Sequence, residues 1–219
     1  MMAGMAPAPP APASPPARRT NAERSAATQT RLLDATIDCL VELGWAGTST
    51  TEVVRRAGVS RGAQVHHFPA KEDLVLAALE HLLMRRIREF EETFAGLPAD
   101  QRSPAAAMRL LYDHCFRDTF AAWLELVVAS RTDPALHERF VQVEERFFDN
   151  ALATFRAMFP DATADQEFAR VALGLAFCVL DGLALNRIIE IDGRALEMVL
   201  DMFNAITAPY FPHAPGGSS

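Results

Sequence analysis

Residues 48–71 read TSTTEVVRRAGVSRGAQVHHFPAK, and this stretch decides the fold. Ser49 is followed three residues later by Glu52, which is the pattern of a capping box at the first turn of a helix. Gly58 can adopt the left-handed conformation that ends a helix. The stretch therefore begins with a short predicted helix.

A second short helix follows within the same stretch. Ser60 can cap its first turn, residues 61–67 supply about two helical turns, and Phe68 and Pro69 stop them. Two short helices joined by a tight glycine turn have the layout of a helix-turn-helix. Four small apolar side chains are expected to hold the pair together: Val53, Val54, Ala57 and Val59.

The flanking sequence predicts one helix on each side of this pair. Asn21 to Leu43 is uninterrupted, and Gly44 is expected to end it as a C-terminal cap would. Its apolar positions follow helical spacing: Leu33, Ile37, Leu40 and Val41. Beyond Pro69, Glu72 and Asp73 open a long fourth helix that should run to about Phe94.

The rest of the chain divides at four breaks, residues 96–98, 132–134, 160–163 and 192–193, into about five further helical segments. No run of alternating β-branched residues stands out. The fold class is therefore expected to be all-α, with about nine helices. Half of the 219 residues are apolar, so the chain can bury a sizeable core.

Both ends are of low complexity. Residues 1–20, rich in Ala and Pro, are expected to form a disordered arm, and residues 212–219 a flexible tail. Arg18 and Arg19 could reach phosphates or a minor groove, or could simply be solvated. The N-terminus has neither the basic nor the apolar region of a signal peptide or an anchor.

The net charge of −7 is unevenly distributed. Residues 1–90 hold 11 Lys and Arg against 9 Asp and Glu, whereas residues 91–219 hold 10 against 19. A mildly basic front on an acidic body is compatible with a nucleic-acid binder, but the same asymmetry occurs in many other proteins.

Cysteine usage favours a reducing, cytoplasmic location. Cys39, Cys115 and Cys178 are far apart and odd in number, which argues against a disulfide framework. The most apolar stretch, residues 171–185, is too short to span a bilayer and carries Asp181. No membrane role is expected.

The stretch of residues 48–71 resembles the signature of the TetR (tetracycline-repressor) family. The shared features are a capped helix, an A-G-V-S turn, a short second helix that ends in an aromatic residue, and then Pro and Lys opening helix four. The resemblance is specific over about residues 21–83 and extends beyond them only in length and helical layout. It implies a DNA-binding domain over residues 21–70 and an effector-binding and dimerisation domain over residues 71–211. A homodimer would bind a pseudo-palindromic DNA operator, and a small-molecule effector would usually release a repressor from it.

The resemblance also implies which residues meet DNA: Thr50, Thr51, Ser60, Arg61, Gln64, His66, His67 and Lys71. Arg can bind guanine, Gln can read adenine, and hydroxyls and Lys pair with phosphate. Many family members have an aliphatic residue and then tyrosine at the positions of Gln64 and Val65. Val65 cannot make the phosphate contact of that tyrosine, which would pass to His66 or His67. Gln64 is interpreted as the specificity residue from its position on the helix. His67 could equally pack against the first helix.

In the C-terminal part, the resemblance implies an effector pocket between residues 103 and 190 and a dimer interface on the last two helices. Candidate effector contacts are His114, Phe116, Arg117, Phe120, Trp123, Phe147, Phe177, Cys178 and Asp181, each of which could instead be an ordinary core or surface residue. Candidate interface residues are Gly174, Gly182, Leu196, Val199, Leu200 and Phe203, although an intramolecular core would look similar.

Two other classes of function have less support. Enzymatic activity is not expected, because no phosphate loop, nucleophile elbow or HExxH motif is present, and no cofactor or metal site is expected either. A helical adaptor that binds proteins through the old DNA-binding face would favour acidic or apolar residues on helix three. This helix instead has Arg61, Gln64 and two histidines.

Overall fold

The computed structural model describes residues 20–115, 119–160, 165–189 and 192–210. These ranges hold helices and turns and no strand, which confirms the all-α prediction. The α-helices are α1 (Asn21–Gly47), α2 (Thr50–Ala57), α3 (Arg61–His67), α4 (Lys71–Gly96), α5 (Pro104–Cys115), α6 (Thr119–Ser130), α7 (Pro134–Met158), α8 (Gln166–Ile188) and α9 (Gly193–Thr207). Two single 3-10 turns lie at Ala99–Gln101 and Ala208–Tyr210.

Helix α1 begins with a complete capping box, in which Thr20 and Glu23 each accept the other's backbone N–H. Gly44 has φ +66° and ψ −177°, so the regular helix stops there as expected. The prediction that the helix ends at Gly44 was nevertheless incomplete, because a kinked extra turn continues to Gly47. Thr48 stabilises the kink, since both its backbone N–H and its hydroxyl donate to the Gly44 carbonyl.

Helices α2 and α3 have the predicted bounds. Ser49 caps α2 by accepting the Glu52 N–H at 3.2 Å, but the carboxylate of Glu52 bonds to arginines instead of returning to the cap. The predicted capping box is therefore only half formed. Gly58, at φ +61°, makes the left-handed turn, and Ser60 caps α3 through the Ala63 N–H.

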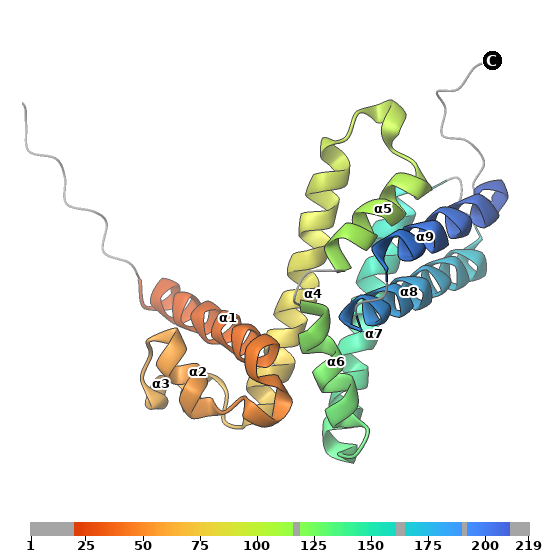
Figure 1. Cartoon of the computed structure of the whole chain (residues 1–219). Helices are drawn as coiled ribbons and strands as arrows, with labels where there is room; N and C mark the ends of the chain where they lie inside the picture. Colours follow the sequence, from red (N-terminus) through yellow and green to blue (C-terminus); the bar gives the residue numbers. More distant parts are fainter. Residues whose placement is uncertain (1–19, 116–118, 161–164, 190–191, 211–219) are drawn as a thin grey trace, which may run out of the picture.

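The first hydrophobic core lies among α1, α2, the end of α3 and α4. Figure 1 shows α1, α2 and α3 gathered on one side of the N-terminal half of α4. Five of the side chains buried among them are Leu32, Val53, Ala57, Phe68 and Leu74. Because α2 and α3 are too short to be stable alone, this shared core holds their orientation.

A second core ties α1 and α4 to the C-terminal helices. Leu40 of α1 is buried with Leu79 of α4, Leu126 of α6 and Phe140 of α7. Helix α1 therefore contacts α6 directly as well as α4. Helices α1 and α4 contribute side chains to both cores. The N-terminal helices are therefore packed against the C-terminal bundle and are not joined to it by a loose linker.

A third core lies between α5, α8 and α9, where Leu180, Leu183 and Leu200 are almost fully buried. Helix α8, at 23 residues, is long and apolar enough to cross a membrane by length and composition. Residues 171–185, the apolar stretch identified from the sequence, therefore cover only part of the apolar helix.

Candidate DNA-binding and effector sites

Helix α3 has two distinct faces. Gln64 and Phe68, four residues apart, are 2% and 7% exposed and point into the first core. Arg61, Gly62, Val65 and His66 are exposed on the opposite side. With 3.6 residues per turn, these four form one continuous outer strip.

Gln64 is not on this outer strip, so its predicted role as a base-reading residue is wrong for this structure. Its side-chain amide Nε2 donates a hydrogen bond to the carbonyl oxygen of Phe68. Phe68 is the residue at which α3 ends, so its carbonyl has no helical partner and needs one from a side chain. Gln64 therefore acts as an internal cap of the C-terminal end of α3.

The other predicted DNA contacts on α2 and α3 differ in their exposure to solvent. Thr51, Ser60, Arg61 and His66 are exposed. Thr50 and His67 are partly buried. The His67 ring lies 5.3 Å from that of His66 and 6.2 Å from that of Phe68, between the outer strip and the core. The hydroxyl of Ser60 already serves the cap of α3.

Lys71 binds the kinked end of α1. Its Nζ donates to the Trp45 carbonyl at 2.7 Å and lies 4.0 Å from the centroid of the Trp45 ring. Burial lowers the pKa of Lys71, although Glu72 opposes that shift. The Lys71 ammonium has three N–H donors, and Trp45 accepts from one of them. The predicted phosphate contact would use another.

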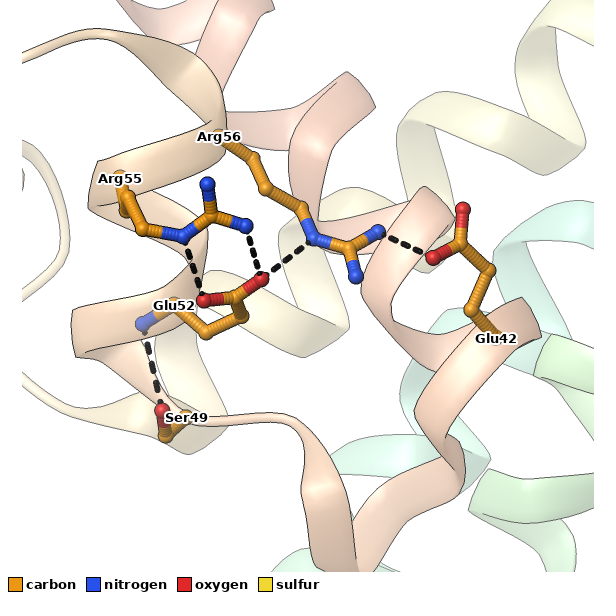
Figure 2. Close-up of polar contacts among 5 residues, drawn as sticks. All are labelled: Glu42, Ser49, Glu52, Arg55 and Arg56. Atoms are coloured by element: carbon orange, nitrogen blue, oxygen red, sulfur yellow. Dashed lines mark hydrogen bonds and ion pairs between the residues drawn. The ribbon is translucent and has the colours of Figure 1, made fainter.

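The basic residues of α2 are neutralised within the protein. Figure 2 shows Glu52 between Arg55 and Arg56, with Arg56 reaching across to Glu42 of α1. The hydrogen bonds from Arg55 and Arg56 lower the pKa of Glu52 to about 2, so it stays ionised at neutral pH. Arg56 links α2 to α1, and Arg61 is left as the unpaired arginine of α2 and α3.

Two residues that sequence reasoning missed connect this unit to the C-terminal helices. The backbone N–H of Trp45 donates to Oε2 of Glu125 on α6 at 2.7 Å. A lone acidic residue on α6 gives no local signal for such a contact, because its partner is 80 positions away in the sequence.

In the C-terminal part, several predicted effector residues do lie near one another. Phe120 and Trp123 of α6 have ring centroids 5.3 Å apart, and Phe147 of α7 and Phe177 of α8 have centroids 5.5 Å apart. Trp123 donates its indole N–H to Oε1 of Glu144 at 3.0 Å. Glu144, on α7, was not predicted.

Two carboxyl groups accompany these rings. Burial raises the pKa of Asp181 to about 6. Burial also raises the pKa of Glu144, the hydrogen bond from Trp123 opposes that shift, and the Asp181 charge adds to it. Among the described residues, no ion pair neutralises either group.

Other predicted effector residues lie elsewhere. Cys178 is exposed on the outer side of α8, so its assignment to an interior site is wrong for the single chain. Phe116, Arg117 and the side chain of His114 lie outside the described part of the chain.

The predicted dimer residues fall on two different faces of α8 and α9. Leu196 and Leu200 are 5% and 0% exposed within the third core, and Phe203 packs against it, so within the single chain these three have the intramolecular core role that the sequence also allowed. Val199 is 49% exposed. Gly174 and Gly182 are partly exposed, and a Cβ added at either would meet no atom within 4 Å.

No cluster of three or more metal-ligating side chains occurs in the described ranges.

Residues 32–78 match the family described as bacterial regulatory proteins, tetR family. The chain is 32% identical over 188 residues to an HTH-type transcriptional regulator of Mycobacterium tuberculosis, a match that spans 86% of this chain and 96% of that relative.

Solved structures show the same fold. A transcriptional regulator from Rhodococcus sp. Rha1 has a TM-score of 0.63 at 27% identity, covering 85% of this chain and 99% of that one. A regulator from Saccharomonospora viridis, crystallised with choline, has a TM-score of 0.59 at 18% identity and covers 84% of this chain and 96% of that one. The chain therefore belongs to the tetR family of bacterial regulatory proteins and is a helix-turn-helix transcriptional regulator.

Proposed function

We propose that the chain acts in the cytoplasm as a homodimeric repressor that binds a pseudo-palindromic operator and leaves it when a small molecule binds the C-terminal helices. The observation that carries the proposal is the outer strip of α3, where Arg61 and His66 are exposed while the opposite face is anchored in the core. A rigid helix with exposed donors suits the major groove.

The test of DNA binding is a fluorescence-anisotropy titration of labelled duplex from the region flanking the gene, with a random duplex as control, at two salt concentrations. Preferential binding to the flanking DNA supports the proposal. Salt-sensitive binding that is equal on both duplexes argues against an operator in that region, and no binding at low salt would favour a protein-interaction adaptor.

The dimer is proposed from an exposed apolar surface on the last two helices. Its residues are Val171, Leu175, Leu185 and Ile188 of α8, and Met198, Val199, Met202 and Ile206 of α9, each between 46% and 65% exposed. A contiguous apolar surface of this kind favours a protein partner. A second copy fits because the symmetry-related surface is equally apolar, and Gly182 leaves room for close helix approach.

Light scattering after size exclusion tests this surface. Leu175→Glu and Met202→Glu should convert a dimer into a monomer and weaken operator binding, because each buries a charge in the interface. Val128→Glu is the matched control, since Val128 is 57% exposed on α6, away from this surface. A wild-type monomer, or mutants that remain dimers, would refute this interface.

The effector site is proposed among Trp123, Glu144, Phe147, Phe177 and Asp181. Aromatic faces beside two carboxylates are complementary to an organic cation, the class of ligand found with the Saccharomonospora viridis regulator. Thermal-shift titration with choline-like quaternary ammonium compounds should stabilise the protein, and the uncharged isostere 3,3-dimethylbutanol should not. Equal stabilisation by the cations and by the uncharged alcohol would show that the site does not require a charged ligand.

A further inference from the structure

One residue of the helix-turn-helix has a side chain whose position folding does not explain. Val65 is 49% exposed on α3. The other valines of this unit, Val53, Val54 and Val59, pack in or against the first core. Val65 contributes nothing to that core, and a β-branched residue is not a preferred helix former.

Its neighbours on the outer strip define what it would meet. Arg61 lies one helical turn before Val65, and His66 follows it directly, so an apolar group lies among hydrogen-bonding groups. Gly62 lies beside them and has no side chain, and a Cβ added there would meet only the Ser60 hydroxyl, at 3.9 Å. The protein therefore leaves open space in front of this part of the strip, and the α3 backbone can approach a partner closely.

We propose that Val65 reads thymine, by placing its methyl groups against the 5-methyl group of the base in the major groove. This inference rests on the proposed binding of a DNA operator by α3. Thymine is the base that presents an apolar group in the major groove, and a valine side chain has no donor or acceptor with which to read the others.

The spacing on α3 also places this thymine relative to the base that Arg61 would bind. Residues four apart on a helix are about 6 Å apart along its axis, and stacked base pairs are about 3.4 Å apart. The thymine should therefore lie within about two base pairs of the Arg61 contact in each half-site. Arg61 favours guanine, so each half-site should contain a guanine and a thymine in close succession.

The test uses deoxyuridine, which lacks the 5-methyl group but keeps every hydrogen-bonding group of thymine. Operator duplex is first selected from a random-sequence pool with the full-length protein. Each thymine of one half-site is then replaced singly by deoxyuridine, and the affinities of wild type, Val65→Ala and Val128→Ala are measured by anisotropy at one salt concentration. Val128→Ala controls for loss of an exposed valine elsewhere.

At one thymine near the Arg61 contact, wild type and Val128→Ala should lose affinity by about fourfold, the factor that corresponds to one buried methyl group. Val65→Ala should bind the thymine and deoxyuridine duplexes equally. If Val65→Ala and wild type respond alike at every position, Val65 does not read thymine, although the operator stands. If wild type selects no sequence at all, the proposed function itself fails, and this inference fails with it.

Discussion

Trp45 and Glu125 join the first helix to the sixth, with the backbone N–H of Trp45 donating to Oε2 of Glu125 at 2.7 Å. The contact lies at the kink of α1, directly after Gly44. Lys71 binds the carbonyl of the same tryptophan. The end of α1 is therefore held by α6 from one side and by the start of α4 from the other.

Gly44→Ala should destabilise the protein by about 2 kcal/mol. The φ and ψ angles of Gly44 lie in a region that is almost restricted to glycine. An added Cβ would also lie 2.8 Å from Oε2 of Glu125. Urea unfolding measures the loss, and Gly96→Ala is the control, because a Cβ there meets nothing within 4 Å. Equal stability of Gly44→Ala and wild type would contradict the kink geometry.

Glu125→Ala should cost about 1 kcal/mol, the usual net contribution of one hydrogen bond. Glu125→Gln should cost less, because its amide oxygen can still accept the Trp45 N–H. Thermal unfolding distinguishes the two variants, with Glu138→Ala as an exposed glutamate control. If Gln and Ala were equally destabilising at position 125, the bond to Trp45 would not be the contribution that Glu125 makes.

Gln64→Leu should lower stability by about 1 kcal/mol and leave the preference for operator over random DNA unchanged. The substitution keeps the buried volume but leaves the Phe68 carbonyl without its partner. Arg61→Ala, on the outer strip, should instead reduce that preference by about 1–3 kcal/mol.

Anisotropy titrations with both duplexes compare the two variants, and urea unfolding reports their stabilities. A selective loss of operator binding by Gln64→Leu, at unchanged stability, would restore Gln64 as a base reader.

The helices of the DNA-binding part could be predicted from sequence because their ends are encoded locally. Ser49, Gly58 and Ser60 mark caps and turns that need no distant partner, and the bounds of α2 and α3 agree with the prediction. The buried side of α3 could also have been inferred. Gln64 precedes Phe68 by four residues and so shares its face, but its polar character pointed to the surface.

The faces of α8 and α9 could not be assigned in the same way. Both helices carry apolar residues on more than one side, and periodicity does not say which side packs within the chain. Leu196 and Leu200 are buried, whereas Met198 and Met202, two positions further along, are exposed. Contacts such as Trp45 with Glu125 depend on the tertiary fold, which local patterns do not encode.

Gly62→Ala should separate folding from DNA binding. Alanine is favoured over glycine in a helix by up to about 1 kcal/mol, and a Cβ at this position has room. The variant should therefore be at least as stable as wild type. Its operator affinity should fall, because the added methyl group would keep α3 from approaching the groove. Thermal unfolding and anisotropy on the same samples test this, and unchanged affinity would show that Gly62 does not face DNA closely.

Asp181→Asn should stabilise the protein at pH 7.5 and have a smaller effect at pH 4.5. Burial raises the pKa of Asp181 from 3.8 to about 6, so the folded state favours the protonated form. The corresponding stability is present below about pH 4 and is lost as the pH rises through about 6. Because Asp181 is partly solvated, the gain at pH 7.5 should be on the order of 1 kcal/mol.

The measurement is the difference in melting temperature between Asp181→Asn and wild type at each pH, which cancels the titration of all other groups. Exposed Asp100→Asn is the control and should show little difference at either pH. A gain at pH 7.5 that a choline-like cation gives to wild type but not to Asp181→Asn would further place the carboxylate at the effector. A stabilisation by Asp181→Asn that is larger at pH 4.5 than at pH 7.5 has the wrong sign, and would mean that the folded protein favours the ionised carboxylate.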